Sequence, residues 1–236
     1  MEEITTIPET AGRDAPLAIG KVETPRQWAQ LGLLVVDGSG SMTDPAAGNI
    51  SKAQATNHAI RELFTRMKVS RVAKNFVFSI ITFDDRPLVR LRPTAVNASL
   101  DENADYNPLK GHGGGTKIFA ALEQAEQITN SFLLQAPAGG VPHSVLILLM
   151  SDGCCSDSTQ TRAVAERIKN GPHGTQVKIC STLFASVGNP DPAGEALLRD
   201  IANDPILGYK TVYDGETLRS FFEKSLSAAS GGVKIA

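Results

Sequence analysis

Two short, entirely apolar runs, each followed by an aspartate, constrain the fold of this chain more than any other feature. Residues 31–36 read LGLLVV and precede Asp37, and residues 145–150 read VLILLM and precede Ser151 and Asp152. A run without alternating polar residues is typical of a strand that is buried on both faces of a sheet. The chain is therefore predicted to be an α/β protein with a sheet at its centre.

Amphipathic segments alternate with these and further apolar segments. Strands are expected at residues 31–36, 76–83, 87–96, 145–150, 176–185 and 209–213. Helices are expected at residues 50–68, 158–169, 192–203 and 215–228, and one more is opened by Thr116. Pro87 and Pro93 favour an edge position for the third strand, because proline cannot donate to a neighbouring strand.

This alternation predicts right-handed crossovers and a mostly parallel sheet with helices on both faces. In such sheets ligands bind beyond the carboxyl ends of the strands, at the point where the strand order reverses. Asp37 and Asp152 each follow an apolar strand, so both are expected at the same edge of the sheet.

The length of 236 residues fits one large domain. Residues 1–28 contain Pro8, Pro16 and Pro25 without sustained periodicity and are interpreted as a partly disordered N-terminal arm. The domain is expected to span residues 29–228, and residues 229–236 a flexible tail.

Composition narrows the possible partners and the cellular location. The formal net charge is −2, with no basic stripe, so no nucleic-acid partner is expected. The apolar runs are too short to span a bilayer, and the polar, acidic start lacks the features of a secretory signal, so a cytoplasmic location without membrane attachment is expected. Three cysteines do not suggest a disulfide framework. Cys154 and Cys155 are interpreted as reduced thiols, with a redox switch or soft-metal site as the alternative.

The turn after the first strand carries the clearest chemistry. Asp37, Ser39 and Ser41 alternate with glycines, which are expected to let the backbone turn tightly so that the side chains converge. Thr116 follows a Gly-rich loop, and Asp152 could add a further oxygen. Carboxylates and hydroxyls are hard donors suited to Mg²⁺, with Mn²⁺ or Ca²⁺ as alternatives. Since only two of the five groups are charged, the ion would attract an external carboxylate.

Three motifs carry a family resemblance. The segments DGSGSM at 37–42, GGGT at 113–116 and SDG at 151–153 resemble the metal-ion-dependent adhesion site (MIDAS) of von Willebrand factor A (vWA) domains. The resemblance implies a Rossmann-like, six-stranded sheet with one antiparallel edge strand. It also implies that Ser39, Ser41 and Thr116 bind the metal directly, that Asp37 and Asp152 act largely through water, and that an Asp or Glu of a partner protein completes the shell.

Among such domains, the chain resembles the standalone bacterial TerY-type proteins associated with tellurite resistance. The resemblance rests on LLVVDGSGSM at 33–42, ITFDD at 81–85 and LLMSDGCCSDS at 148–158. It implies a role as a scaffold or adaptor in a bacterial stress-response or defence system, with a Ser/Thr kinase or phosphatase as partner. Cys154 and Cys155 depart from the expected pattern, and so does Lys117, a cation directly after Thr116.

Enzymatic interpretations have weaker support. His112 with Gly113–Gly115 resembles the oxyanion element of esterases, but the G-x-S-x-G elbow is missing, so His112 is expected on the surface of a loop. A metal-dependent phosphoesterase would need several clustered carboxylates, for which Asp84 and Asp85 are candidates, although an adjacent pair is usually a solvated turn. The chain is therefore expected not to be an enzyme, and an extracellular adhesion domain is the third hypothesis.

Overall fold

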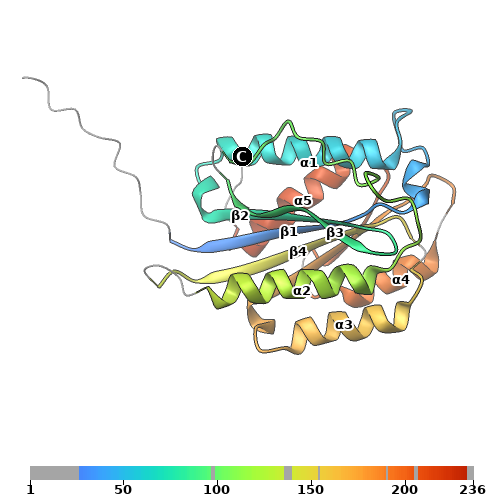
Figure 1. The fold of residues 1–236 in the computed structure, drawn as a ribbon. Helices are drawn as coiled ribbons and strands as arrows, with labels where there is room; N and C mark the ends of the chain where they lie inside the picture. The colour runs from blue at the N-terminus through green and yellow to red at the C-terminus, as the bar shows by residue number, and fades with distance from the viewer. Residues whose placement is uncertain are drawn as a thin grey trace, which may run out of the picture.

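In the computed structural model, the sheet is built from strands that match the apolar runs. The structure describes residues 27–96, 99–135, 140–153, 155–189, 191–204 and 207–232. Within these residues the strands, listed in chain order, are β1 (Ala29–Asp37), β2 (Phe76–Phe83), β3 (Pro87–Ala95), β4 (His143–Ser151), β5 (Val177–Phe184) and β6 (Tyr209–Val212). They form one six-stranded sheet in the order β3-β2-β1-β4-β5-β6 (Figure 1).

The direction of the strands agrees with the predicted fold class. β1 pairs in parallel with β2 and β4, and β4–β5 and β5–β6 are also parallel. β3 pairs antiparallel with β2 at the edge, as the prolines predicted. The chain moves from β1 toward β2 and β3 on one side and later from β4 toward β5 and β6 on the other. The strand order therefore reverses between β1 and β4.

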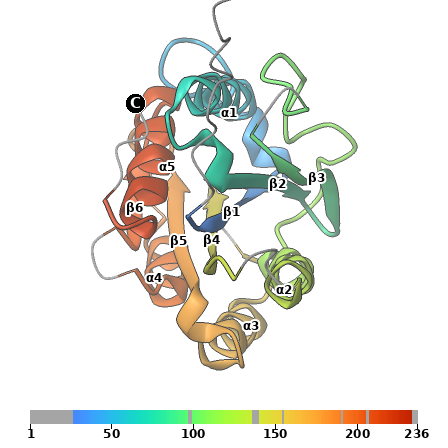
Figure 2. The same cartoon turned by 90° about the vertical axis from the view of Figure 1, so that its left-hand side faces the viewer.

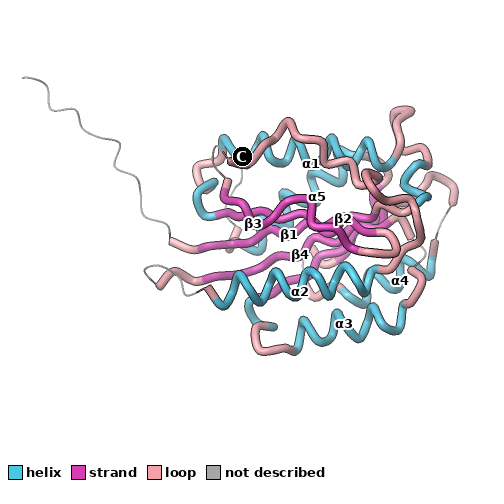
Figure 3. Tube along the Cα trace, viewed as in Figure 1, coloured by secondary structure: helices cyan, strands magenta, loops and turns pink. Residues whose placement is uncertain are grey.

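Helices cover both faces of the sheet, as expected. They are α1 (Lys52–Val69), α2 (Ile118–Leu134), α3 (Ser158–Asn170), α4 (Pro192–Ile201) and α5 (Gly215–Ala229). Figure 2 looks along the strands and shows α1 and α5 on one face, with α2, α3 and α4 on the other. The loops after β1 and β4 lie at the same end of the sheet (Figure 3).

The sheet separates two hydrophobic clusters. β1 contributes alternate residues to each, because successive side chains of a strand point to opposite faces. Leu34 and Val36 pack with α1 and α5, whereas Leu33 and Val35 pack with α2, α3 and α4. The central strand is therefore buried on both sides, which explains its unbroken apolar sequence.

Aromatic residues near both ends of the described chain pack into the core. Trp28 packs edge-on against Phe76 at 5.0 Å between ring centroids. Phe221 and Phe222 of α5 are both buried in the cluster that α5 forms with α1 and the sheet. Most of the predicted arm and the last four residues of the tail lie outside the described residues. No described helix is long and apolar enough to cross a membrane.

Candidate metal centre

The carboxyl ends of β1 and β4 bring the two predicted aspartates together. Asp37 is the last residue of β1, and Ser151 is the last residue of β4. Because Val36 pairs with Met150, Asp37 and Ser151 lie side by side at the carboxyl ends of these two central strands, and Asp152 follows directly. The prediction that Asp37 and Asp152 share one edge is confirmed, and that edge is at the reversal of strand order.

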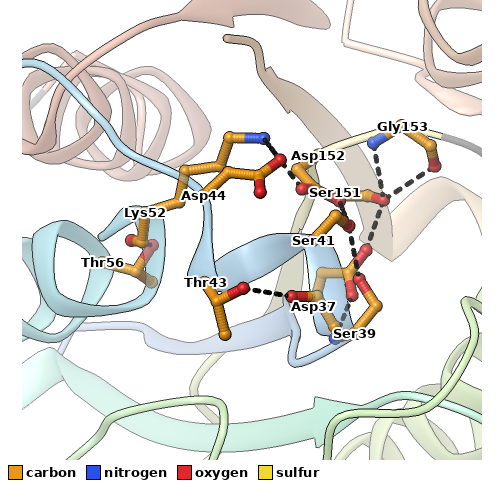
Figure 4. Close-up of polar contacts among 11 residues, drawn as sticks. Asp37, Ser39, Ser41, Thr43, Asp44, Lys52, Thr56, Ser151, Asp152 and Gly153 are labelled. Atoms are coloured by element: carbon orange, nitrogen blue, oxygen red, sulfur yellow. Dashed lines mark hydrogen bonds and ion pairs between the residues drawn. The ribbon is translucent and has the colours of Figure 1, made fainter.

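A continuous chain of hydrogen bonds links four of the five predicted ligands (Figure 4). The Ser39 backbone N–H donates to Asp37 Oδ1 at 2.8 Å, and the Ser39 and Ser41 hydroxyl oxygens are 3.2 Å apart. Ser41 Oγ then donates to Asp152 Oδ1 at 2.8 Å. Asp37, Ser39 and the Asp152 side chain are buried while Ser41 is exposed, so the chain of oxygens reaches the surface at Ser41.

The buried position of Asp37 is unfavourable for a charged carboxylate. Its burial raises its pKa to about 6, and the nearby charge of Asp152 adds to the rise. Hydrogen bonds oppose this effect, including the one that Ser151 Oγ donates to Asp37 Oδ2 at 2.6 Å. A cation placed between the two carboxylates would relieve both causes of the raised pKa.

Gly38 has a different purpose from the one that the sequence suggested. Neither Gly38 nor Gly40 is among the glycines with positive φ. The expected tight turn therefore does not explain why glycine occupies these two positions. A Cβ on Gly38 would lie 2.3 Å from the Pro108 carbonyl oxygen. Gly38 therefore allows the long polar loop before α2 to pack directly against the turn after β1.

The Gly-rich loop that ends at Thr116 contacts the turn after β1 and the segment after Asp152 through its backbone. The Gly40 N–H donates to the Gly114 carbonyl at 3.1 Å, and the Thr116 carbonyl accepts from the Ser156 N–H at 2.9 Å. Among the described residues, the Thr116 hydroxyl is not part of the hydrogen-bonded chain. The helix begins two residues later than expected, because α2 starts at Ile118 and Thr116 belongs to the loop.

Asp84 and Asp85 hold this Gly-rich loop in place. Asp84 Oδ2 accepts from the Gly114 N–H and Asp85 Oδ2 from the Gly115 N–H, both at 3.1 Å. Partial burial acts to raise the pKa of Asp84, but hydrogen bonds led by the one from His112 keep it below its usual value. Asp84 is buried and is not part of a solvated turn. These contacts engage the carboxylates that a phosphoesterase would need for its metals.

His112 is also part of the support for the loop, and its expected surface position is wrong. Its side chain is fully buried, with Nδ1 2.9 Å from Asp84 Oδ1 and Nε2 2.8 Å from Thr82 Oγ1. The order carboxylate, imidazole, hydroxyl resembles a hydrolase triad. However, Thr82 is completely buried and its hydroxyl also accepts from Arg90 Nε at 3.2 Å. The arrangement ties β2 to the loop and offers no surface for a substrate.

Two residues in the site were not among the predicted ligands. Ser151 holds the Asp37 carboxylate, and Lys52 at the start of α1 lies with Nζ 2.9 Å from Asp152 Oδ2 (Figure 4). Ser151 could have been found from its position in the SDG motif. For Lys52 the signal is weaker: it is a cation in the first turn of a helix, where acidic side chains are preferred.

The donor chemistry fits a hard divalent cation. Two neighbouring ligands in an octahedral Mg²⁺ shell lie about 3 Å apart, close to the 3.2 Å between the Ser39 and Ser41 hydroxyl oxygens. No group of three or more His, Cys, Asp and Glu side chains among the described residues could hold a metal ion. The oxygen donors gathered at these strand ends are the hydroxyls of Ser39 and Ser41 together with the carboxylates of Asp37 and Asp152.

Cys155 and Cys180 are the cysteines within the described residues, and both are free thiols. Cys154 is outside the described residues, so the structure tests neither the reduced-thiol interpretation nor the redox-switch or soft-metal alternative at that position. Cys155 Sγ lies 3.2 Å from Thr161 Oγ1. Cys180 is buried in the sheet, and this burial raises the pKa of its thiol to about 12.

The fold and this edge define a class of α/β domains with a polar site at the reversal of strand order. Residues 33–153 match the family model of the von Willebrand factor type A domain. The chain belongs to this family. No curated protein sequence matches it.

Solved structures with the same fold come from several bacteria. The PilB minor pilin of Streptococcus sanguinis aligns with a TM-score of 0.66 at 12% identity, over 88% of this chain and 63% of that protein. The pilus adhesin SpaC of Lactobacillus rhamnosus GG aligns at 0.64 and 15%, over 86% and 30%. A von Willebrand factor type A protein of Catenulispora acidiphila aligns at 0.63 and 16%, over 86% and 43%. The chain thus spans less than two thirds of each, and the likeness concerns the fold.

Proposed function

We propose that this chain is a divalent-metal-dependent protein-binding module. A Mg²⁺ ion would be held by Ser39, Ser41 and Thr116, with Asp37 and Asp152 acting largely through water, and Mn²⁺ or Ca²⁺ could replace it. The observation that carries the proposal is the chain of oxygens from Asp37 to Asp152 at the sheet edge, with its 3.2 Å hydroxyl pair.

The charge of the site favours an acidic partner. Asp37 and Asp152 are the two carboxylates of the proposed ligand set, and the hydroxyl ligands are neutral, so a divalent ion would not be over-neutralised. A partner Asp or Glu would add the charged oxygen that the shell lacks. The exposed position of Ser41 leaves the outer end of the site accessible to such a side chain.

The proposed biological setting rests on the likeness to TerY-type proteins. We place the module in the bacterial cytoplasm as a scaffold or adaptor of a stress-response or defence system, with a Ser/Thr kinase or phosphatase as partner. On this proposal the chain is not an enzyme. The engagement of Asp84 and Asp85 by the Gly-rich loop supports that view, since it removes the carboxylates of the phosphoesterase alternative.

Direct metal binding is the first test. Free Mn²⁺ is measured by electron paramagnetic resonance during titration of the natural chain, of Asp37→Ala and of Ser39→Ala. Both variants are expected to bind at least about tenfold more weakly. The matched control is Asp105→Ala, which removes an exposed carboxylate that is paired with Lys110 and is outside the proposed ligand set. Equal binding by all four proteins would refute the proposed ligands.

Partner capture is the second test. The immobilised chain is exposed to cell extract in Mg²⁺ and in EDTA, and proteins retained only in Mg²⁺ are tested individually after replacement of their Asp and Glu residues. Capture that is the same with Asp37→Ala, or the same in EDTA, would contradict the mechanism. Cell fractionation separates the cytoplasmic proposal from the alternative of an extracellular adhesion domain.

A further inference from the structure

Lys52 is a buried cation within the candidate metal centre. Its side chain is 3% exposed, as is that of Asp152, and its Nζ lies 2.9 Å from Asp152 Oδ2. A second carboxylate, that of Asp44, is 3.9 Å away but 54% exposed. Figure 4 shows the Lys52 side chain extending from α1 toward Asp152.

The position of Lys52 is electrostatically unfavourable, and the helix does not need a lysine there. It is the first residue of α1, where the partial positive charge of the helix end disfavours a cation, and no acidic residue lies in the first turn. The helix already has a complete capping box between Ser51 and Gln54, so the lysine is not needed to start it. Burial of the ammonium adds a desolvation cost. The contact with Asp152 is what offsets these costs.

The lysine and the metal ligands make use of the same carboxylate. Asp152 Oδ1 accepts from Ser41 Oγ, and Asp152 Oδ2 accepts from Lys52 Nζ. Both oxygens are thus engaged by the protein itself. Counting Asp37, Asp152 and Lys52, the inner charges are −1, −1 and +1, so the site has a net charge of −1 instead of −2.

We propose that Lys52 is a built-in counter-cation that competes with the divalent metal for Asp152 and so keeps the intrinsic metal affinity low. This inference rests on the metal site of the proposed function. With the lysine paired, the protein holds its two carboxylates without any metal. With a divalent ion added, the lysine makes the site more positive, which favours metal binding together with an acidic partner over metal binding alone.

The test compares Mn²⁺ binding by the natural chain, by Lys52→Met and by Lys117→Met. Methionine keeps most of the length of the lysine side chain without its charge. Loss of a charge this close to the metal is expected to tighten binding by about tenfold or more. Lys117 follows Thr116 but is 41% exposed and paired with Asp85, so its replacement should change binding by less than about twofold.

The outcomes separate this inference from the function on which it rests. If the natural chain binds Mn²⁺ and Lys52→Met binds equally well or more weakly, the competition is refuted while the metal site stands. If neither protein binds Mn²⁺, the proposed metal function itself fails. If Lys52→Met alone binds, or binds more tightly, both are supported.

A second measurement needs no variant, in case Lys52→Met does not fold. The natural chain is acetylated briefly with an amine-reactive ester in EDTA or in saturating Mn²⁺, and each lysine is quantified by mass spectrometry. Lys52 is expected to be protected in EDTA and several-fold more reactive in Mn²⁺, whereas the exposed Lys224 should react equally in both. Unchanged protection of Lys52 with Mn²⁺ bound would overturn the competition.

Discussion

At the scale of single residues, the site places charge where water is scarce. Asp37 is completely buried, and its oxygens are satisfied by the Ser39 N–H and by Ser151 Oγ. These contacts do not fully compensate for the lost water, because the pKa of Asp37 is still raised from 3.8 to about 6. The carboxylate is thus maintained at a cost in stability, which is expected of a functional group.

That cost predicts how stability depends on pH without metal. The folded chain keeps the Asp37 proton up to about pH 6, while the unfolded chain releases it near 3.8. The folded state therefore binds more protons in this window, and stability falls as the pH rises through it. In EDTA, Asp37→Asn should gain up to about 3 kcal/mol relative to the natural chain between pH 4 and pH 7.

Urea denaturation at a series of pH values measures this difference. Asp105→Asn is the control, because a hydrogen bond from Lys110 lowers the pKa of Asp105. Replacing this carboxylate should make the variant less stable than the natural chain as the pH rises, which is opposite to the effect of Asp37→Asn. A difference between Asp37→Asn and the natural chain that stays flat from pH 4 to pH 7 would contradict the raised pKa.

Which residues of the site can be predicted from sequence depends on how local their signals are. Asp37, Ser39 and Ser41 lie in one short motif, so their convergence could be predicted. Lys52 contacts Asp152 across 100 positions in the chain, and its unusual place in the first turn of a helix does not identify Asp152 as the partner. The buried position of His112 was equally hidden, because it depends on Asp84 and Thr82 from another strand end.

At the scale of elements, loops were harder to predict than strands and helices. Most helices and strands follow apolar periodicity, and β2 was predicted to the residue. The loop before α2 has no periodicity, and its shape comes from Asp84, Asp85 and His112. The start of α2 was misplaced because Lys117 has a non-helical backbone (φ −100°, ψ 77°), with its N–H donating to the Asp84 carbonyl.

The support of this loop by His112 leads to a prediction. His112→Gln loses one of the two contacts to Asp84 and Thr82, because a single amide cannot span both, and stability should fall by about 1–3 kcal/mol. Trypsin should cleave faster after Lys110 and Lys117, which flank the loop. Urea denaturation and timed proteolysis measure the two effects.

The control for this prediction is His173→Gln. His173 precedes β5 at the opposite end of the sheet, where its ring contacts Gln176, so its loss should cost less and leave cleavage at the loop unchanged. Equal stability losses for the two variants, with no change in cleavage, would show that His112 does not hold the loop.

Packing of the loop against the turn after β1 leads to a graded prediction. A Cβ at Gly38 would lie 2.3 Å from the Pro108 carbonyl oxygen, whereas a Cβ at Gly40 would lie 3.2 Å from that of Gly113. Gly38→Ala should therefore destabilise the chain by about 1–3 kcal/mol, and Gly40→Ala by clearly less. Thermal unfolding in EDTA compares the two, and the reverse order would contradict the close approach of the loop.

At the scale of the whole molecule, the strand order determines where function can be located. From β1 the chain crosses over toward β2, and from β4 it crosses over toward β5, in the opposite direction. The carboxyl ends of β1 and β4 therefore lie next to each other, and they bring Asp37 and Asp152 together. The alternation of elements predicted a mostly parallel sheet and placed both aspartates at the carboxyl ends of its strands, but the strand order came only from the structure. The side-chain contacts within the site could not be predicted either, since they join loops from four separate parts of the chain.

The central strand also couples the two faces of the molecule. Leu34 belongs to the cluster with α1 and α5, and the adjacent Leu33 to the cluster with α2, α3 and α4. Neither cluster can lose its packing without disturbing β1, so the domain should unfold in a single transition. Leu33→Ala and Leu34→Ala should each lower the free energy of unfolding by about 2–5 kcal/mol without separating the faces.

Two probes test this coupling. Trp28 is the single tryptophan and packs on Phe76 in the cluster of α1 and α5, so its fluorescence reports one face, whereas far-ultraviolet circular dichroism reports helices on both. The two urea curves should coincide for the natural chain and for both variants. If Leu33→Ala shifted the circular dichroism curve but left the Trp28 curve in place, the faces would unfold independently. A metal site at the end of β1 could not then stabilise both, whereas with coupled faces metal binding should shift both curves together.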